Sequence, residues 1–237
     1  MAVRPKPPPP TTVLLVRHGT TDTTGKVLPG RAAGLHLSEA GKGQALAASE
    51  RIAAWSEALR RRPAPAGRGG RRQRQEPSPG ITAVYASPLE RTRETAAPIA
   101  KALNLRVQAD RGLLECDFGE WTGASLKDLW KLPEWSTVQR YPSGFRFPGG
   151  ESFAGMQTRI VETLARIKAS HPGETVVAVS HADPIKAAVA DAVGTHLDLF
   201  QRIVISPCSV TAITYGALGP TVLAVNSTGT LRELVPS

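Results

Sequence analysis

The hydrophobic positions of this chain fall into short runs that stop at polar residues. Residues 13–16 are four apolar residues in succession, and Arg17, His18 and Gly19 follow them directly. Residues 81–85 and 175–179 form two further runs. Short runs rich in β-branched residues and leucine are typical of buried strands. We therefore predict three buried strands, each of which ends in polar side chains.

Helices are predicted between these strands. Ser38 is a suitable N-cap, and Glu39 suits the positive end of a helix dipole. The helix that starts there is expected to fail at Pro63. Its apolar face is predicted to consist of Leu46, Ile52, Ala53 and Leu59. Further helices are expected over residues 88–103, over residues 152–170, and after Asp183, which is predicted to be an N-cap ahead of a proline.

Three weaker apolar segments, residues 105–107, 210–215 and 221–225, are interpreted as short strands. Residues 118–150 hold most of the aromatic side chains of the chain. That segment is interpreted either as a lid over a substrate or as a small packed subdomain. In open α/β sheets ligands bind outside the carboxyl ends of the strands. The polar ends of the predicted strands are therefore where a functional site is expected.

Two segments are predicted to lie outside the packed part of the chain. Residues 1–12 are basic, and a polyproline run stands where a signal peptide would have its apolar core. Residues 63–80 are rich in proline, glycine and arginine and hold too few apolar side chains to fold. We expect a flexible arm over residues 1–12 of a cytoplasmic protein. One domain over residues 13–237 would follow, with a disordered insertion at about 63–80.

The net charge of +9 is concentrated in one segment. Without seven arginines that have no acidic residue among them, the net charge would be +2. The excess charge thus belongs to that segment, which disfavours a nucleic-acid partner for the folded surface. No apolar run approaches the roughly 20 residues of a membrane helix, and two cysteines define neither a disulfide framework nor a metal site. The seven arginines are Arg60, Arg61, Arg62, Arg68, Arg71, Arg72 and Arg74.

Arg17 and His18 suit a phosphate site. A guanidinium group can clamp two phosphate oxygens, and an imidazole can attack phosphorus or donate a proton. Gly19 lets the backbone approach closely. On their own these three residues are better explained as a surface arginine and a capping histidine, because so short a motif often occurs by chance.

Three more motifs change this interpretation. SPLERTRETA at residues 87–96 follows the second strand, VSHAD at residues 179–183 ends the third, and LECDFGEWTG occupies residues 114–123. Together with the first motif they resemble the histidine phosphatase superfamily, which has the phosphoglycerate mutase-like fold. The resemblance extends from about Val13 to about Val225. It implies an α/β fold, in which a three-layer α/β/α domain has a mostly parallel central sheet.

The resemblance also implies catalytic roles. His18 would attack phosphorus and carry the phosphoryl group, for which it must be neutral. Arg17 and Arg91 would clamp the phosphoryl oxygens. His181 would be protonated and would add a further donor.

Glu115 is the general acid that the resemblance implies. The neighbouring Leu113 and Leu114 are expected to raise its pKa by excluding water. Asp117 is the rival for this role, since some branches of the family place the acid differently.

Substrate contacts are implied for Arg17, Arg91 and His181, and also for Thr24, Gly30 and Ala182. Thr24 stands where the family often has Asn, and its hydroxyl can still donate a hydrogen bond. Gly30 and Arg31 are explained equally well by a flexible polar loop. The resemblance implies no cofactor, and no carboxylate or histidine cluster has the spacing of a metal site.

The expected activity is metal-independent hydrolysis of a small phosphate monoester through a phosphohistidine. A phosphomutase and an inactive module that binds a phospholigand or nucleic acid are the alternatives. In the mutases of the family the acid begins a Glu-Arg-x-Tyr-Gly pattern, whereas residues 115–119 read ECDFG here. The pattern therefore favours a phosphatase. The partner is expected to be a small phosphate ester, and the oligomeric state cannot be deduced.

Overall fold

The computed structural model describes residues 9–61 and 80–231. Most of the predicted arm over residues 1–12, and the predicted insertion at 63–80 except for its last residue, lie outside the described residues. The disorder predicted for these segments therefore stays a prediction.

A six-stranded sheet forms the centre of the molecule, with the strand order β3-β2-β4-β1-β5-β6. β1, β2, β3 and β4 are parallel to one another, and β5 and β6 extend the sheet as antiparallel strands. The predicted mostly parallel sheet is confirmed. Its strands are β1 (Thr11–Arg17), β2 (Ile81–Ala86), β3 (Val107–Ala109), β4 (Thr175–Ser180), β5 (Val210–Gly216) and β6 (Gly219–Ser227).

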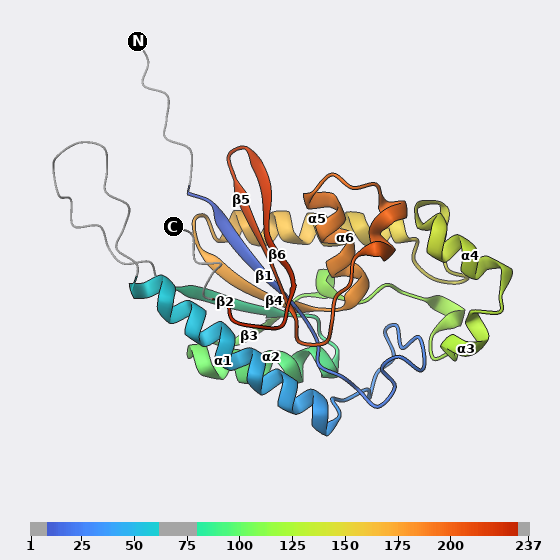
Figure 1. Cartoon of the computed structure of the whole chain (residues 1–237), viewed down its shortest axis with the longest axis horizontal. Helices are drawn as coiled ribbons and strands as arrows, with labels where there is room; N and C mark the ends of the chain where they lie inside the picture. The colour runs from blue at the N-terminus through green and yellow to red at the C-terminus, as the bar shows by residue number, and fades with distance from the viewer. Residues whose placement is uncertain (1–8, 62–79, 232–237) are drawn as a thin grey trace, which may run out of the picture.

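Helices cover both faces of this sheet (Figure 1). Alternate residues of a strand point to opposite faces, and β1 follows this rule. Leu14 and Val16 pack in one core cluster with α1 (Glu39–Arg61) and α2 (Glu90–Leu103). Val13 and Leu15 pack in another cluster with α5 (Phe153–Ser170) and α6 (Ala182–Ala192). The three-layer α/β/α architecture is therefore confirmed.

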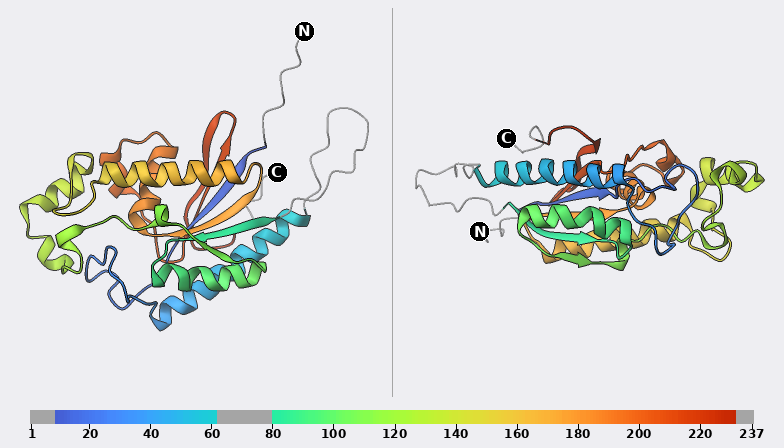
Figure 2. Two further views of the ribbon diagram at one scale, coloured as in Figure 1. Left: turned by 180° about the vertical axis from the view of Figure 1, so that it is seen from behind. Right: turned by 90° about the horizontal axis from the view of Figure 1, so that it is seen from below.

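The aromatic segment is packed. α3 (Leu126–Leu129) and α4 (Pro133–Arg140) lie together at one end of the molecule (Figure 1, Figure 2). Beneath them the rings of Phe145 and Phe147 are 5.0 Å apart, and those of Phe147 and Phe153 are 5.1 Å apart. Of the two interpretations, this arrangement favours a packed subdomain. Short 3-10 turns at Arg111–Leu113, Gly119–Trp121, Pro142–Gly144 and Leu197–Arg202 complete the described part.

The predicted strand at residues 105–107 is wrong by two residues. Asn104 ends α2 in the left-handed conformation with φ 57°. The chain needs the next two residues to turn toward the sheet, so β3 begins at Val107. The N-cap predicted at Asp183 is also wrong, because α6 begins at Ala182 and His181 is its N-cap. Asp183 instead lies in the first turn of α6, where its negative charge suits the helix dipole.

The predicted core face of α1 is partly wrong. Ser38 is an N-cap as expected, since its Oγ accepts a hydrogen bond of 3.1 Å from the Gly41 amide. Leu46, however, is 57% exposed. The buried stripe of α1 includes Ile52 and Leu59 and also Trp55, which the sequence reading left out.

Two glycines let the loop after β1 lie directly on the first turn of α1. A Cβ on Gly19 would stand 2.6 Å from the carbonyl oxygen of Gly41, and a Cβ on Gly41 would stand 2.1 Å from that of Thr20. Both distances are shorter than any van der Waals contact. The close approach fixes the backbone next to His18, because that loop can move away only by lifting off α1.

Replacement of Gly41 by Ala tests this contact. Gly41→Ala should lower the free energy of unfolding by about 1–3 kcal/mol, as other overpacking substitutions do. Gly43 is the matched control, because it lies in the same helix and a Cβ there meets nothing within 4 Å. Gly43→Ala should be neutral or stabilise by about 0.5–1 kcal/mol. Urea unfolding of both variants measures the difference, and equal effects would contradict the close contact.

Candidate active site

The register of the sheet brings three polar strand ends together. Arg17 at the end of β1 pairs with Ser180 at the end of β4, and Ala86 at the end of β2 pairs with Val179 of β4. The chain leaves all three strands at one edge, where the His18 amide donates to the Ser180 carbonyl at 3.0 Å. This edge therefore gathers His18, His181 and the start of α2, as the strand-end pattern predicts.

His18 and His181 face each other across this edge. Their rings are 5.2 Å apart between centroids, and both side chains are buried. Nδ1 of His18 lies 2.7 Å from the carbonyl oxygen of Gly19. A carbonyl oxygen only accepts hydrogen bonds, so Nδ1 carries the proton and Nε2 keeps its lone pair.

Burial lowers the pKa of His18 to about 3, and the positive charges of Arg91 and Arg17 add to this effect. His18 is therefore neutral at physiological pH. A neutral imidazole with a free Nε2 is the form of histidine that can attack phosphorus.

His181 is neutral without a bound anion, so the protonated form that the resemblance implies for the substrate complex stays a prediction. Its Nδ1 lies 3.3 Å from Nη2 of Arg91, which can only donate, and its Nε2 lies 2.9 Å from Oγ of Ser87. Burial lowers the pKa of His181 well below its ordinary value, and Arg91 lowers it further. The nearby charges are cationic, so protonation of His181 requires an anion in the site.

The two arginines hold hydrogen-bond donors that meet no acceptor within the described part of the chain. Arg91 is fully buried; its Nη2 donates to the Gly30 carbonyl at 2.7 Å, but its Nε and Nη1 lack partners there. Nη1 of Arg17 donates to the Ile205 carbonyl at 2.6 Å, and its Nε also lacks a partner. A buried unsatisfied donor costs about 1–3 kcal/mol. The site is therefore suited to an anion with several oxygens.

Glu115 is the buried carboxyl group of the site, and its Oε1 accepts a hydrogen bond of 3.0 Å from the Cys116 amide. Burial raises the pKa of Glu115 to about 7, and the negative charge of Asp183 raises it further, while Arg91 and Arg17 oppose both effects. A carboxyl group that is half protonated near neutral pH can act as acid and then as base.

Asp117, the rival acid, lies in a different environment. Its side chain is 41% exposed and forms an ion pair of 3.4 Å with Arg31. Its Oδ1 also accepts from the Gly119 amide at 3.1 Å. An exposed and paired carboxylate is a poorer candidate for a proton donor than the buried Glu115.

The other predicted substrate contacts have identifiable local roles. Oγ1 of Thr24 accepts from the Thr21 amide at 2.8 Å and so closes a turn. Gly30 is buried, has φ +51° and offers its carbonyl to Arg91. Ala182 is the first residue of α6, next to His181. A contact of Thr24, Gly30 or Ala182 with substrate stays a prediction.

Several residues that contact the site are not among the predicted site residues. Ser87, which contacts His181, stands at the start of a motif already singled out, so its position was a usable signal. Arg31, for which the sequence is explained equally well by a polar loop, donates to the Glu115 carbonyl at 2.9 Å. Glu151 lies in the Pro-Gly-Gly-Glu-Ser sequence of residues 148–152, which is similar to one that the family often has and was a usable signal. Arg159 gives no sequence signal of its own, because the Glu115 carbonyl that it contacts lies 44 residues away.

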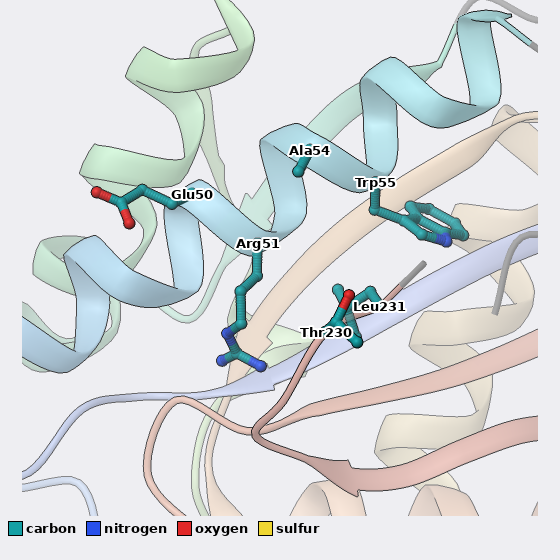
Figure 3. A pocket seen from close by; sticks show the side chains of 6 residues that line it. All are labelled: Glu50, Arg51, Ala54, Trp55, Thr230 and Leu231. Carbon is teal, nitrogen blue, oxygen red and sulfur yellow. The ribbon is translucent and has the colours of Figure 1, made fainter. Parts of the chain in front are cut away.

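A separate cavity of about 360 Å³ lies beside α1 (Figure 3). Trp55 in its wall is 14 residues along the helix from Gly41, which corresponds to roughly 20 Å at the rise of an α-helix. Arg51 of this wall donates to the carbonyls of Ser227, Gly229 and Cys208. It thus ties the end of β6 to α1 and is not part of the candidate site at the strand ends.

Two further properties concern only residues 9–61 and 80–231. None of the helices there combines the length and the apolar character that crossing a bilayer requires. In the same residues no three His, Cys, Asp or Glu side chains lie close enough together to hold a metal ion.

The geometry agrees with comparisons to known proteins. The family description "Histidine phosphatase superfamily (branch 1)" matches residues 70–228. The chain therefore belongs to the histidine phosphatase superfamily. This match begins after Arg17 and His18, so the place of these two residues in the site depends on the sheet register described above.

Two curated relatives extend the comparison. The chain is 32% identical over 230 residues to the bifunctional protein Rv2228c of Mycobacterium tuberculosis, covering 94% of this chain and 55% of the relative. It thus spans about half the length of that relative. It is 31% identical over 163 residues to phosphoserine phosphatase 1 of Hydrogenobacter thermophilus, covering 65% of this chain and 74% of the relative.

Solved structures support the fold. YhfR of Bacillus stearothermophilus superposes with a TM-score of 0.75 at 24% identity, over 92% of this chain and 97% of that one. A phosphoserine phosphatase of Entamoeba histolytica in complex with phosphoserine gives a TM-score of 0.75 at 22% identity, over 92% and 98%. At such identities the likeness shows the fold alone.

The raised pKa of Glu115 predicts a pH-dependent stability. Between pH 4.5, its ordinary pKa, and about pH 7 the unfolded chain loses this proton while the folded chain retains it. The free energy of unfolding should therefore fall over this window. Glu115→Gln has no proton to lose at this position. Its free energy of unfolding, relative to that of the wild type, should therefore increase as pH rises, by on the order of 3 kcal/mol above pH 7.

Thermal unfolding of both proteins at pH 5 and pH 8 measures this increase in relative stability. Asp117→Asn is the matched control, because it changes a neighbouring carboxylate that is exposed and paired. It should show no comparable gain between the two pH values. A constant difference between Glu115→Gln and the wild type at both pH values would contradict the buried, protonated carboxyl group.

Proposed function

We propose that this protein is a phosphatase that hydrolyses a small phosphate monoester through a phosphohistidine at His18. The observation that carries the proposal is the set of unpartnered buried donors on Arg17 and Arg91 beside a neutral histidine. A phosphate dianion supplies the oxygens and the negative charge that these donors lack. The name of the relative phosphoserine phosphatase 1 supports the same class of reaction.

The first chemical step is transfer to His18. The lone pair on Nε2 forms a bond to phosphorus while the bond from phosphorus to the ester oxygen breaks. The departing alkoxide takes the proton of Glu115, since an unprotonated alkoxide is a poor leaving group. Arg17 and Arg91 hold the equatorial oxygens and stabilise their charge in the transition state.

The second step releases phosphate. Glu115, now a carboxylate, removes a proton from a water molecule that attacks phosphorus. The bond between phosphorus and Nε2 breaks, and its electron pair returns to neutral His18. Inorganic phosphate leaves, and Glu115 is protonated again.

His181 would change its protonation state with the ligand. Without an anion the arginines keep it neutral. A bound dianion opposes those charges, so it raises the pKa of His181 and favours the protonated form. The donor role that the family resemblance implies would thus depend on substrate.

Hydrolysis is favoured over phosphomutase activity by residues 115–119. Cys116 and Phe118, which replace the Arg and Tyr of the mutase pattern, are both buried. Neither supplies a charge or a hydroxyl that could hold an intermediate while it turns. Asp117 adds little to this preference, because its ion pair with Arg31 offsets the negative charge that would otherwise repel a substrate carboxylate.

We expect the wild type to release inorganic phosphate from small monoesters and to form a phosphoenzyme that acid destroys and alkali does not. His18→Ala should lose at least about 10³-fold in rate, which equals about 4 kcal/mol of barrier. Rapid quenching with labelled substrate, followed by peptide mapping, locates the label. Label on another residue would contradict the role of His18, whereas faster interconversion of phosphoglycerates than their hydrolysis would indicate a mutase.

The identity of the acid is tested by the leaving group. Glu115→Gln should reduce kcat on an alkyl phosphate by about 10²-fold or more, because the alkoxide needs a proton. The loss should be far smaller on a nitrophenyl phosphate, whose phenolate leaves unaided. Asp117→Asn should respond alike to both esters. If Asp117→Asn showed the selective loss and Glu115→Gln did not, the two roles would have to be exchanged.

A further inference from the structure

The backbone that carries Glu115 is bound by arginine side chains. Nη1 of Arg159 donates to the carbonyls of Gly112 and Leu114, each at 2.8 Å. Its Nη2 lies 3.3 Å from the Glu115 carbonyl. Nε of Arg31 donates to the same Glu115 carbonyl at 2.9 Å. Two guanidinium groups from distant parts of the chain therefore meet at one carbonyl oxygen.

Glu151 joins these two arginines. Its Oε1 accepts from Nε of Arg159 at 2.9 Å, and its Oε2 accepts from Nη2 of both arginines, at 2.9 Å from Arg159 and 3.0 Å from Arg31. The backbone of Glu151 adds a hydrogen bond of 2.8 Å from its amide to the Asp117 carbonyl. The three side chains are only 16–29% exposed. Charge-assisted pairs of this kind with little exposure hold their geometry better than surface ion pairs.

The position of the Glu115 carbonyl affects the orientation of the Glu115 carboxyl group. The carbonyl belongs to the same planar peptide group as the Cys116 amide. That amide donates to Oε1 of Glu115 itself, at 3.0 Å. The arginines that fix the carbonyl thereby fix the plane of the amide, and the amide fixes the carboxyl group.

Arg31 also links Glu115 to the phosphate clamp, which consists of Arg17 and Arg91. The preceding residue, Gly30, accepts from Arg91 at 2.7 Å. Gly30 thus contacts Arg91 of the clamp, and the adjacent Arg31 contacts the peptide group of residues 115–116. Gly30 is confined in this position, because a Cβ there would lie 2.9 Å from Oγ1 of Thr122.

We propose that Arg31 is a positioning residue for the general acid, acting through the peptide group of residues 115–116 together with Glu151 and Arg159. This inference rests on the phosphatase function proposed above. Arg31 does not transfer a proton. It holds Glu115 where the leaving oxygen of a substrate clamped by Arg17 and Arg91 can take its proton.

Arg31→Gln tests this role by its dependence on the leaving group. It should reduce kcat on an alkyl phosphate by about tenfold or more, while kcat on a nitrophenyl phosphate should change by less than about threefold, because only the former needs the acid. Arg166→Gln is the matched control. Arg166 lies on α5, is 58% exposed and pairs with Asp110 at 2.8 Å. It contacts neither Glu115 nor the phosphate clamp in the described contacts, so both esters should be hydrolysed normally.

A titration that needs no turnover provides the second measurement. The ¹³C resonance of the Glu115 carboxyl group reports its pKa in the wild type and in Arg31→Gln. Loss of a positive charge alone would raise this pKa. Loss of positioning should lower it from about 7 toward the ordinary value of 4.5, as the carboxyl group turns out of its buried place. The charges of Arg17 on β1, Arg91 on α2, Arg159 on α5 and Asp183 on α6 are the same in both proteins.

Equal losses of kcat on both esters, or an unchanged or raised pKa of Glu115, would overturn the proposed role of Arg31. A wild type that releases phosphate from neither ester would refute the proposed function instead. In that case the titration still decides whether Arg31 positions the carboxyl group.

Discussion

Buried positive charge is the constraint on which the rest of the site depends. Arg91 is fully buried, and neither it nor Arg17 forms an ion pair with a carboxylate in the described residues. Burial lowers the pKa of both guanidinium groups, yet an arginine stays charged in proteins. The fold therefore holds two poorly solvated cations, and their Nε atoms and Nη1 of Arg91 meet no acceptor within residues 9–61 and 80–231. An anionic ligand would relieve this cost on binding.

The same low-dielectric environment sets the states of the other groups. Burial opposes whichever form is charged, so it lowers the pKa of a histidine and raises that of a carboxyl group. His18 is thereby a free base and Glu115 retains its proton up to about pH 7. These are the states that a nucleophile and a general acid need at the start of phosphoryl transfer. Burial therefore sets the protonation states of both His18 and Glu115.

Features that depend on the local pattern of apolar and polar residues could be predicted from the sequence. Apolar runs that stop at Arg17, His18 and His181 placed these residues at strand ends, and the sheet register brings the ends together. Errors arose where tertiary contacts decide. Leu46 fits the helical period but lies outside the buried stripe of α1. The contact between His181 and Arg91, which favours the neutral form of His181 in the anion-free site, is also tertiary, because the two residues are 90 positions apart.

The network around Glu115 was hidden from the sequence for a related reason. Arg31 and Arg159 donate to backbone carbonyls, and Glu151 joins the two arginines, so these contacts do not depend on the side chains at positions 112 and 114. The backbone of residues 115–117 is thus held by contacts that do not involve the side chains of Cys116 and Phe118. Cys116 and Phe118 can therefore serve as packing residues here, where the mutase pattern has Arg and Tyr. Under the proposed function, the position of the acid and the chemistry offered to the leaving group would be set by different residues, so a change of substrate would not require a change in the residues that position Glu115.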